Sequence, residues 1–394
     1  MASHAASAAR PDEIRQHNLS LVLNHVHRFG NITRAQLTKR LRLSRSTVAA
    51  LVGDLKDLGL VEEQVPSGRT TVGRPSYLVG PARAGPYTVA VDIDMPRVTI
   101  AAIGLGGVVL TRDLVTVDGG ALSPERLVEC VAERVRTLHG ILPEARLCGV
   151  GLSVPGTVDL ATGRIGVAPN LGWEEVELGA LLGRVVPEGV RVVAGNDADL
   201  AVLAEHRRGS ARDADDVVYL LGRVGVGGGI IAGGVPLRGR DGHAGEIGHN
   251  VLDPTGPRCH CGQRGCVETY IGDAALLTAA GRPGAPSAET MAGLFAAAQT
   301  GDAAALRAVR GGAEPLGRTI AALLNTLNSE RVVLGGSLCE LLELARSDVE
   351  GFVTAYSFGR ANRDVRLVPP ALGKDSSLLG AAEIAFADLL AHPR

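Results

Sequence analysis

The chain has 394 residues, of which 45% are hydrophobic and 21% charged, with a net charge of −2. Since domains usually hold about 100 to 200 residues, this length predicts a globular protein of more than one domain. Residues 1–15 lack the apolar core of a secretory signal, and the most apolar run, Val224–Leu237, is broken by six glycines. We therefore expect a cytoplasmic protein without a membrane partner.

Charge is divided unevenly along the chain. Residues 1–86 hold 12 Lys and Arg against 6 Asp and Glu, a balance of +6, whereas the remainder holds 28 against 36, a balance of −8. A basic head on an acidic body predicts an anionic partner for the head alone. Aromatic residues make up only 3% of the chain, which disfavours stacking on single-stranded nucleic acid and favours duplex DNA.

Residues 1–80 predict a winged helix-turn-helix domain. Apolar residues recur at helical spacing from Glu13 to Phe29, and the pattern stops at Gly30. We expect Thr33 to cap a second helix and Ser44 to cap a third. The third helix is expected to bury Val48, Leu51, Val52, Leu55 and Leu58. Residues 61–79 then predict two short strands around a tip that contains Gly and Arg, the shape of a wing.

Five side chains of this domain are candidates for DNA contact. Arg45, Ser46 and Thr47, at the start of the third helix, are predicted to reach base edges in the major groove. Arg69 and Arg74, at the wing tip, are predicted to contact phosphates or the minor groove. The alternative is a plain three-helix bundle with solvated arginines, because helical periodicity alone does not separate the two. The segment LGLVEE followed by a hairpin with GRPS resembles the winged helix-turn-helix of bacterial repressors, which favours double-stranded operator DNA.

Residues 81–86 predict a linker with Pro and Gly, and residues 87–394 an α/β body. Three β-branched runs open the body as a strand meander, followed by a helix and a buried strand that ends before Gly156. A second α/β unit follows, with a helix from Asp197 to Arg208 between two strands and a late strand over residues 331–336.

Two kinds of stretch in this body carry weak signals for ligand binding. Asn196 and Asp197 lie between a strand and a helix, where side chains point into the crevice at the carboxyl end of the strand. An Asp at this place accepts a proton from a hydroxyl, or simply caps the helix. A glycine-rich loop over residues 225–229 and a second glycine turn would admit a phosphate or serve as plain tight turns. The glycines concerned are Gly225, Gly227, Gly228, Gly335 and Gly336.

Residues 242–270 predict a metal site. The candidate ligands are His249, Cys259, Cys261 and Cys266. One imidazole and three thiolates suit a closed tetrahedral Zn²⁺ site without a position for water, so the predicted metal is structural. Free thiols in a loop are the alternative, which the C-x-C-x4-C spacing disfavours. His243 and His260 are rival ligands, and His260 is expected to be exposed because it stands between two ligands.

The stretch GHAGEIGHNVLDPTGPRCHCGQRGCVETYIG resembles the signature of the ROK family, which groups bacterial sugar kinases with sugar-responsive repressors. The resemblance extends over nearly all of residues 86–394. It implies an actin-like, ribonuclease-H-like body of two lobes with a sugar in the cleft. It also implies that the sugar hydroxyls are faced by Gly156, Asn196, Asp197, Glu246, His249 and Glu268. Asp197 matches the general base of the kinases, and His249 would bind zinc through one ring nitrogen and leave the other for the sugar.

One departure from the family pattern bears on nucleotide binding. Family kinases open the body with a phosphate-binding turn D-x-G-x-T, and the matching segment here runs from Asp92 to Pro96. Asp94 replaces the glycine, and Pro96 has neither an N–H nor a hydroxyl group to offer. These changes are expected to weaken the binding of ATP and Mg²⁺ by several kcal/mol, which Arg97 offsets only in part.

These features predict a sugar-responsive DNA-binding transcriptional regulator, preferably a repressor, whose kinase-like body binds a sugar as effector. The alternative is an active ATP-dependent, glucokinase-like sugar kinase with an attached DNA-binding domain, in which Asp197 would be catalytic. A nucleic-acid zinc finger is disfavoured, because the cysteines lack a paired-His spacing and lie in the acidic body. Paired DNA half-sites and the family resemblance favour a homodimer or homotetramer.

Overall fold

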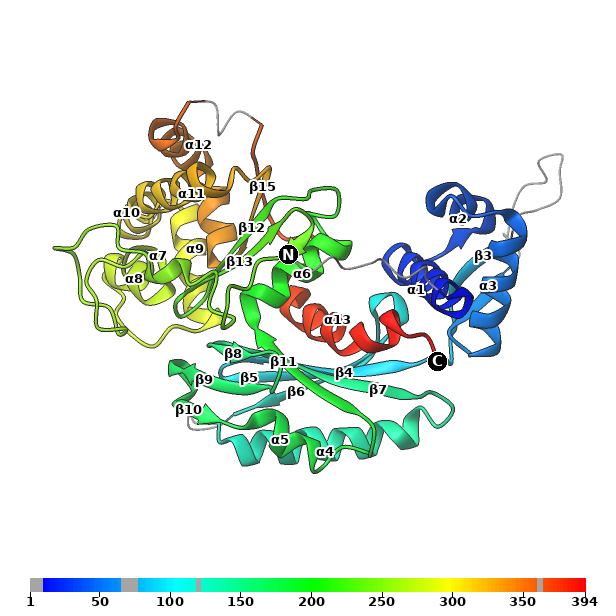
Figure 1. Cartoon of the computed structure of the whole chain (residues 1–394). Coiled ribbons are helices and arrows are strands. Elements are labelled where there is room, and N and C mark those ends of the chain that lie inside the picture. The colour runs from blue at the N-terminus through cyan, green and yellow to red at the C-terminus, as the bar shows by residue number, and fades with distance from the viewer. Residues whose placement is uncertain (1–9, 65–76, 118–121, 360–363) are drawn as a thin grey trace, which may run out of the picture.

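The N-terminal part of the chain folds as three helices and a small sheet in the computed structural model, which describes residues 10–64, 77–117, 122–359 and 364–394 (Figure 1). Its elements are α1 (Pro11–Phe29), β1 (Ile32–Thr33), α2 (Arg34–Leu41), α3 (Arg45–Asp57), β2 (Val61–Gln64) and β3 (Leu78–Pro81). Thr33 accepts the backbone N–H of Gln36, and Ser44 accepts that of Thr47, which confirms both predicted caps. The strand order β1-β3-β2 makes β2 and β3 the two sides of a wing.

The first lobe of the body is built on a five-stranded sheet of order β11-β7-β4-β5-β6. Its strands are β4 (Tyr87–Asp94), β5 (Arg97–Gly104), β6 (Val108–Thr116), β7 (Leu147–Val154) and β11 (Arg191–Asn196). The predicted antiparallel meander of β4, β5 and β6 is confirmed, and β7 and β11 add parallel strands. On one face of this sheet lie α4 (Pro124–Ile141) and α5 (Leu178–Gly183) (Figure 1). Three short strands, β8 (Val158–Asp159), β9 (Arg164–Ala168) and β10 (Trp173–Val176), form a separate small sheet.

The second lobe is built on another five-stranded sheet, of order β14-β13-β12-β15-β16. Its strands are β12 (Val217–Gly222), β13 (Val226–Ala232), β14 (Val235–Pro236), β15 (Arg331–Gly336) and β16 (Arg366–Val368). Its helices are α7 (Glu268–Ile271), α8 (Asp273–Ala279), α9 (Ala288–Gln299), α10 (Ala303–Gly311), α11 (Ala313–Leu327) and α12 (Ser337–Tyr356). Buried leucines and alanines of α8 to α12 form one apolar core with β12 and β15. Among the described helices, none is both long and apolar enough to cross a membrane.

The glycine run after β12 is a strand, so the predicted glycine loop over residues 225–229 is wrong. Gly227 and Gly228 belong to β13 and pair with Leu221 and Leu220 of β12 in an antiparallel ladder, and only Gly225 remains in the turn. Glycine is required at these positions of β13 because neighbouring segments pack closely against both faces of the strand. A Cβ on Gly228 would collide with the Ile247 side chain, and one on Gly229 would collide with the backbone carbonyl of Ala198.

Two helices lie between the lobes and cross each other closely (Figure 1). These are α6 (Asp197–Arg208), which has the predicted bounds, and the C-terminal α13 (Ser376–Ala391). At their crossing a Cβ on Gly380 of α13 would collide with the backbone carbonyl of Leu200 in α6. The two helices are therefore in close backbone contact at this point.

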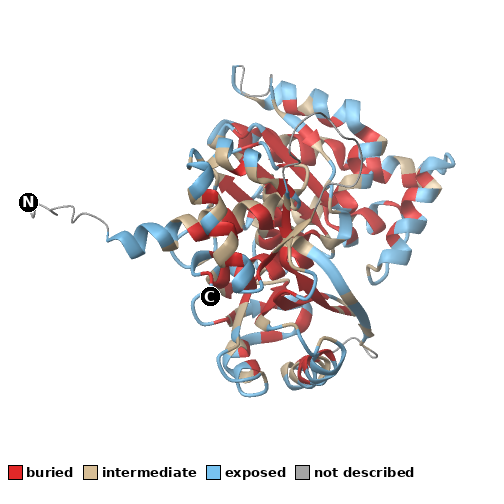
Figure 2. Cartoon of the chain, turned by 90° about the vertical axis from the view of Figure 1, so that its right-hand side faces the viewer, coloured by how far each residue is buried: buried red, intermediate tan, exposed pale blue. Residues whose placement is uncertain are grey.

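The head packs directly on the body. Apolar side chains of α1, α2 and α3 share one core with three side chains at the C-terminal end of α13, Phe386, Leu389 and Leu390. Ser20 and Asn24 of α1 both donate hydrogen bonds to the Leu390 carbonyl, at 2.7 and 3.0 Å. The first turns of α1 are exposed, and its buried residues begin where it approaches the body (Figure 2). Because burial of apolar area is the main favourable term in association, this shared core fixes the orientation of the head.

Candidate functional site: a cysteine–histidine cluster beside an interlobe cleft

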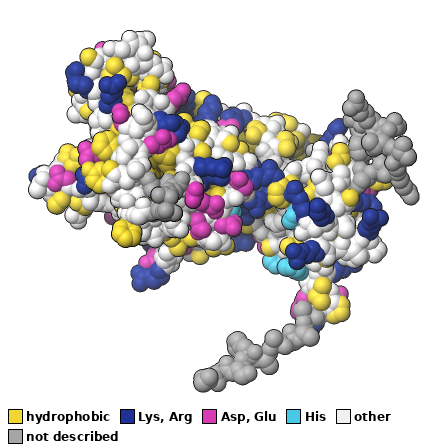
Figure 3. All heavy atoms as spheres, turned by 90° about the horizontal axis from the view of Figure 1, so that it is seen from above, with side chains coloured by type: hydrophobic (Ala, Val, Ile, Leu, Met, Phe, Trp, Pro, Cys, Tyr) yellow, Lys and Arg dark blue, Asp and Glu magenta, His cyan; other side chains and the backbone are white. Residues whose placement is uncertain are grey.

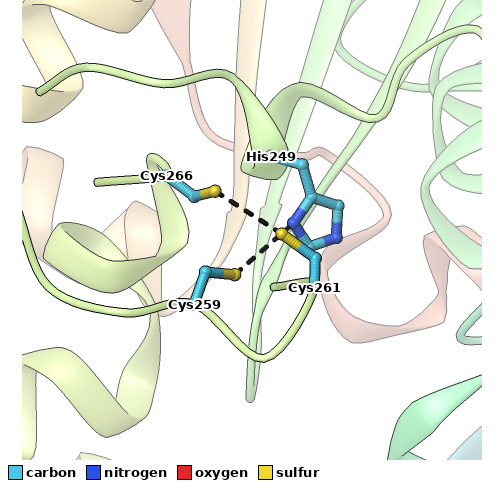
Figure 4. Close-up of side chains that lie close together, drawn as sticks. All are labelled: His249, Cys259, Cys261 and Cys266. Carbon is cyan, nitrogen blue, oxygen red and sulfur yellow. Dashed lines mark hydrogen bonds between the residues drawn. The ribbon is translucent and has the colours of Figure 1, made fainter. Parts of the chain in front are cut away.

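The four predicted metal ligands lie together. His249 ends a short 3₁₀ turn (Ile247–His249), and the three cysteines come from the loop between this turn and α7 (Figure 4). Their ligand atoms all lie within 4.8 Å of one another. Cys261 Sγ is 3.7 Å from Cys266 Sγ, and Cys259 Sγ is 3.7 Å from His249 Nδ1.

This geometry fits a zinc ion. Tetrahedral zinc with Zn–S bonds of about 2.3 Å requires ligand atoms about 3.8 Å apart, close to the two separations of 3.7 Å. Burial raises the pKa of the Cys259 and Cys266 thiols, so that a bound cation is needed to hold them as thiolates. The nitrogen facing the thiols is Nδ1, which leaves Nε2 of His249 for another partner.

Glu268, the first residue of α7, touches the cysteine–histidine cluster. Its Oε1 lies 3.0 Å from Cys259 Sγ, 2.8 Å from His260 Nδ1 and 3.9 Å from His249 Nδ1. His260 is exposed, as predicted, but it forms a second ligand group with His249 and Glu268. His243 belongs to neither of the two groups found among the described residues. The carboxylate of Glu268 is thus positioned by its contacts with Cys259 and His260.

Asn196 and Asp197 stand where β11 ends and α6 begins. Asn196 caps α6, because its Oδ1 accepts the backbone N–H groups of Ala198 and Asp199, at 2.9 and 3.2 Å. Its Nδ2 donates to the Gly156 carbonyl at 3.0 Å. Asn196 is therefore the capping residue, and although Asp197 Oδ1 also accepts the Ala198 N–H at 2.9 Å, its Oδ2 faces Arg223. Burial raises the pKa of Asp197 to about 6, against the opposing effect of the Arg223 guanidinium.

The residues implied for sugar binding form two sets. The first set consists of Asn196, which is hydrogen-bonded to the Gly156 carbonyl, and its neighbour Asp197. The second set consists of His249 and Glu268, which lie close to each other. The hairpin of β12 and β13 approaches both sets, since a Cβ on Gly225 would meet Glu268 and one on Gly227 would be 3.9 Å from Asp197 Oδ1. No direct hydrogen bond or ion pair between the two sets is found in the described residues. Glu246 is exposed at the start of the 3₁₀ turn.

Two residues of this region were missed by the sequence analysis. Asp199 lies one turn along the face of α6 from Asn196, and burial raises its pKa to about 7. Arg238 opposes this rise, while Asp197 and Glu246 add to it, which places Glu246 electrostatically close to α6. The second aspartate of the motif GNDAD was the available signal. Arg223 is the second missed residue, and its guanidinium lies among three carboxylates. No local pattern marked Arg223, because its partners are far away in the sequence.

Arg223 also lines a cavity of about 440 Å³. It is lined by Asp94, Pro96, Arg223, Asp273, Phe295 and Ser337, among others. Of the five glycines predicted for nucleotide binding, Gly336 lines this cavity. Gly225, Gly227, Gly228 and Gly335 do not appear among its lining residues.

The candidate DNA-contacting residues are partly described. Arg45 and Ser46 are exposed and Thr47 is half-buried in the first turn of α3, where the three serine and threonine hydroxyls of residues 44, 46 and 47 are hydrogen-bonded together. Arg69 and Arg74 lie outside the described residues. Lys and Arg side chains are spread over the surface of the head (Figure 3).

Comparison with known proteins matches the chain to two families. The ROK family matches residues 88–387, and the MarR family matches residues 20–69. The xylose repressor of Bacillus spizizenii is 26% identical over 380 residues, which cover 96% of this chain and 97% of the repressor. The glucokinase of Halalkalibacterium halodurans is 30% identical over 311 residues, which cover 75% of this chain and 93% of the kinase.

A solved structure has the same overall architecture. The crystal structure of a ROK family transcriptional regulator, a homologue of the E. coli MLC protein, superposes with a TM-score of 0.77 at 26% identity. The superposition covers 96% of this chain and 97% of that regulator, so it includes both the head and the two lobes. Because the ROK match spans the body from β4 into α13, the protein belongs to the ROK family, with a MarR-type winged helix domain ahead of its actin-like body.

Proposed function

We propose that the protein is a sugar-responsive, DNA-binding transcriptional repressor whose kinase-like body binds a sugar without phosphorylating it. The observation that carries this proposal is the packing of a winged helix domain into one core with α13 of a sugar-kinase-like body. The near full-length similarity to a xylose repressor supports it. The partners are double-stranded operator DNA and a small sugar, and the protein acts in the cytoplasm as a homodimer or homotetramer.

The sugar site comprises Gly156, Asn196, Asp197, Glu246, His249 and Glu268. A structural Zn²⁺ held by His249, Cys259, Cys261 and Cys266 supplies a rigid cross-link that fixes the loop before α7. Carboxylates and an amide in the two sets would accept and donate hydrogen bonds to sugar hydroxyls, and Nε2 of His249 is the nitrogen left for the sugar. A sugar placed between the sets would bridge α6 to the segment around α7.

The sugar signal reaches the head through α6. This helix of 12 residues starts at Asp197 in the sugar site and ends at Arg208, about 18 Å away. At its far end Arg28 of α1 donates hydrogen bonds to the carbonyls of His206 and Arg207, at 3.1 and 3.2 Å. Arg28 thereby satisfies carbonyls that the last turn of α6 leaves without helical partners.

A buried network locks α1 to both interlobe helices. His27 Nδ1 accepts the Gly106 backbone N–H at 3.0 Å, and its Nε2 is hydrogen-bonded to the Glu383 carboxylate of α13 at 3.2 Å. Glu383 also pairs with Arg207 and Arg208 of α6. Burial would raise the pKa of Glu383, but His27 and the two arginines together hold it well below the usual carboxyl range. A sugar-induced change in the angle between the lobes would therefore move the head and shift the population of DNA-binding arrangements.

The test is DNA binding with and without sugars. Fluorescence anisotropy with a duplex from the region upstream of the gene should show binding that weakens with salt, and one member of a sugar panel should change the affinity. The same sugar should raise the melting temperature of the protein, since it binds only the folded state. Absence of DNA binding at moderate salt, with every sugar of the panel, would refute the proposal.

A sugar kinase is the second candidate, because Asp197 is retained at the cleft and a glucokinase shares 30% identity with the body. A coupled assay for ADP release across hexoses and acetylated amino sugars separates the two functions. Turnover that is abolished by Asp197→Asn would establish the kinase, and we expect no turnover above the background of that variant.

A further inference from the structure

Arg223 occupies the centre of a carboxylate triad. It is the first residue after β12, and its side chain leaves the second lobe toward the first. Its Nη2 lies 3.6 Å from Asp92 Oδ2, its Nε 3.6 Å from Asp94 Oδ1 and its Nη1 3.3 Å from Asp197 Oδ2. Each carboxylate thus faces a different nitrogen of one planar guanidinium, a geometry that the ammonium of lysine cannot reproduce.

The triad depends on Arg223 for its charge balance. The Asp92 and Asp197 side chains are 7% and 8% exposed, and that of Arg223 is 21% exposed. Among the described residues, every ion pair of these three aspartates goes to Arg223. Buried carboxylates without a cation would be costly, because desolvation penalises the charged form. Burial does raise the pKa of Asp92, and Arg223 opposes that rise.

The cation of the kinase members of the family does not fit here. ATP is used with Mg²⁺, an ion that binds carboxylate oxygens and substrate phosphates together. In this chain the oxygens of the triad already surround a positive charge, and a divalent ion among them would meet the guanidinium at close range. The approach of phosphates is opposed as well, since Asp94 adds a negative charge at the cavity and Pro96 has no N–H to donate.

We propose that Arg223 is a resident cation that takes the place of a divalent metal between the lobes and excludes the metal–nucleotide complex from the cleft. It joins β12 of the second lobe to β4 of the first, with Asp197 at the start of α6 as the third partner. The two lobes are thereby bridged beside Asp197 by a side chain of the protein itself, which cannot dissociate as a metal ion can. Sugar binding then needs no nucleotide to order the cleft.

The experiment measures Mn²⁺ binding by the zinc-loaded full chain, since Mn²⁺ is a paramagnetic probe of Mg²⁺-type oxygen sites. Wild type should not bind Mn²⁺ at the triad, so the paramagnetic resonance spectrum of free Mn²⁺ should stay unchanged when wild type is added. Arg223→Met removes the charge with similar bulk and leaves three carboxylates, so it should bind one Mn²⁺ per chain at least about tenfold more tightly than wild type. Arg126→Met is the matched control, because Arg126 forms an exposed pair with Glu129 on α4, and it should behave as wild type.

Two further variants keep the proposal testable. Asp94→Asn combined with Arg223→Met should lose the gained Mn²⁺ affinity, which locates the ion at the triad. Arg223→Lys keeps a positive charge and should still exclude Mn²⁺, so it serves if Arg223→Met fails to fold. Equal Mn²⁺ affinity of wild type and Arg223→Met would overturn the proposal, as would Mn²⁺ binding by Arg223→Lys at the triad. These readouts involve neither DNA nor sugar, so their failure is distinguishable from failure of the proposed repressor function.

Discussion

His27 in the DNA-binding head and Glu383 in the last helix of the body are hydrogen-bonded at 3.2 Å, with side chains only 1% and 2% exposed. They are 356 positions apart in the chain. The contact means that the head has one preferred orientation on the body. Any rearrangement of α6 against α13 acts on this contact, because Arg207 and Arg208 of α6 pair with the same carboxylate.

Glu383→Gln should therefore destabilise the protein and weaken the sugar effect on DNA binding. Removing one member of a buried ion pair leaves the arginines uncompensated, which typically costs about 3 to 5 kcal/mol. The measurements are urea unfolding and the ratio of DNA affinities with and without sugar. Glu129→Gln, in the exposed pair with Arg126, is the control and should change stability by less than about 1 kcal/mol. An unchanged affinity ratio in a folded Glu383→Gln protein would contradict the coupling route.

Asp199 should make stability depend on pH. Its pKa is raised to about 7 in the folded state, whereas an unfolded Asp titrates near about 4. Between these values the folded state binds more protons than the unfolded state, so stability falls as pH rises from about 4 to about 7 and is level above. The charged groups that face Asp199 are Arg238, Asp197 and Glu246.

Asp199→Asn removes this titration and should be more stable than wild type at pH 8, by on the order of 1 to 3 kcal/mol. Its unfolding free energy should also change less between pH 4 and pH 7. Asp348→Asn, at an exposed position of α12, is the control. If Asp199→Asn and wild type show parallel stability curves over this pH range, the raised pKa is refuted.

Sugar affinity should also follow pH through Asp197. The carboxylate accepts hydrogen bonds from hydroxyl groups, and it forms as pH rises through about 6. Affinity measured by calorimetry should therefore increase between pH 5 and pH 7 by a few-fold, on the order of tenfold at most. Three charged groups face Asp197: the Arg223 guanidinium favours its charged form, whereas Asp92 and Asp94 favour its protonated form. Asp197→Asn should bind sugar weakly at both pH values, and a pH effect that survives in this variant would assign the dependence elsewhere.

Cys261→Ser should lose zinc and the sugar response together. A serine hydroxyl is a poor ligand for zinc, and the loop that leads into α7 and Glu268 would lose its cross-link. Metal content by mass spectrometry and sugar-dependent DNA affinity are the two measurements, and DNA binding without sugar should persist. Cys339→Ser, at a single cysteine of α12 outside the cluster, is the control. Retention of the sugar response by a zinc-free protein would show that the cross-link is unnecessary.

Arg45→Ala should weaken DNA binding. Arg45 is exposed in the first turn of α3, and loss of one base-edge contact typically costs about 1 to 3 kcal/mol. Anisotropy with the upstream duplex measures the effect, and Arg136→Ala on α4 of the body is the control. Equal affinity of the two variants would place Arg45 outside the DNA interface.

Features governed by neighbouring residues were predictable from the sequence. Caps at Thr33 and Ser44 depend on a hydroxyl and an N–H three positions later, and the bounds of α6 depend on Asn196 and Gly209 at its two ends. The closeness of Cys259, Cys261 and Cys266 likewise follows from their spacing within eight positions. Each of these depends on short segments whose geometry is set by local backbone preference.

Features that join distant segments were decided only by the tertiary structure. Arg223 meets Asp92 and Asp94 across the lobes, and His27 meets Glu383 across almost the whole chain. The glycine run after β12 has the same composition as a phosphate loop, and only packing against Ala198 and Ile247 makes it a strand. Charge compensation and close packing depend on distance in space and not on distance along the chain. A sequence pattern can therefore identify the residues, but only the folded structure shows which partners they contact.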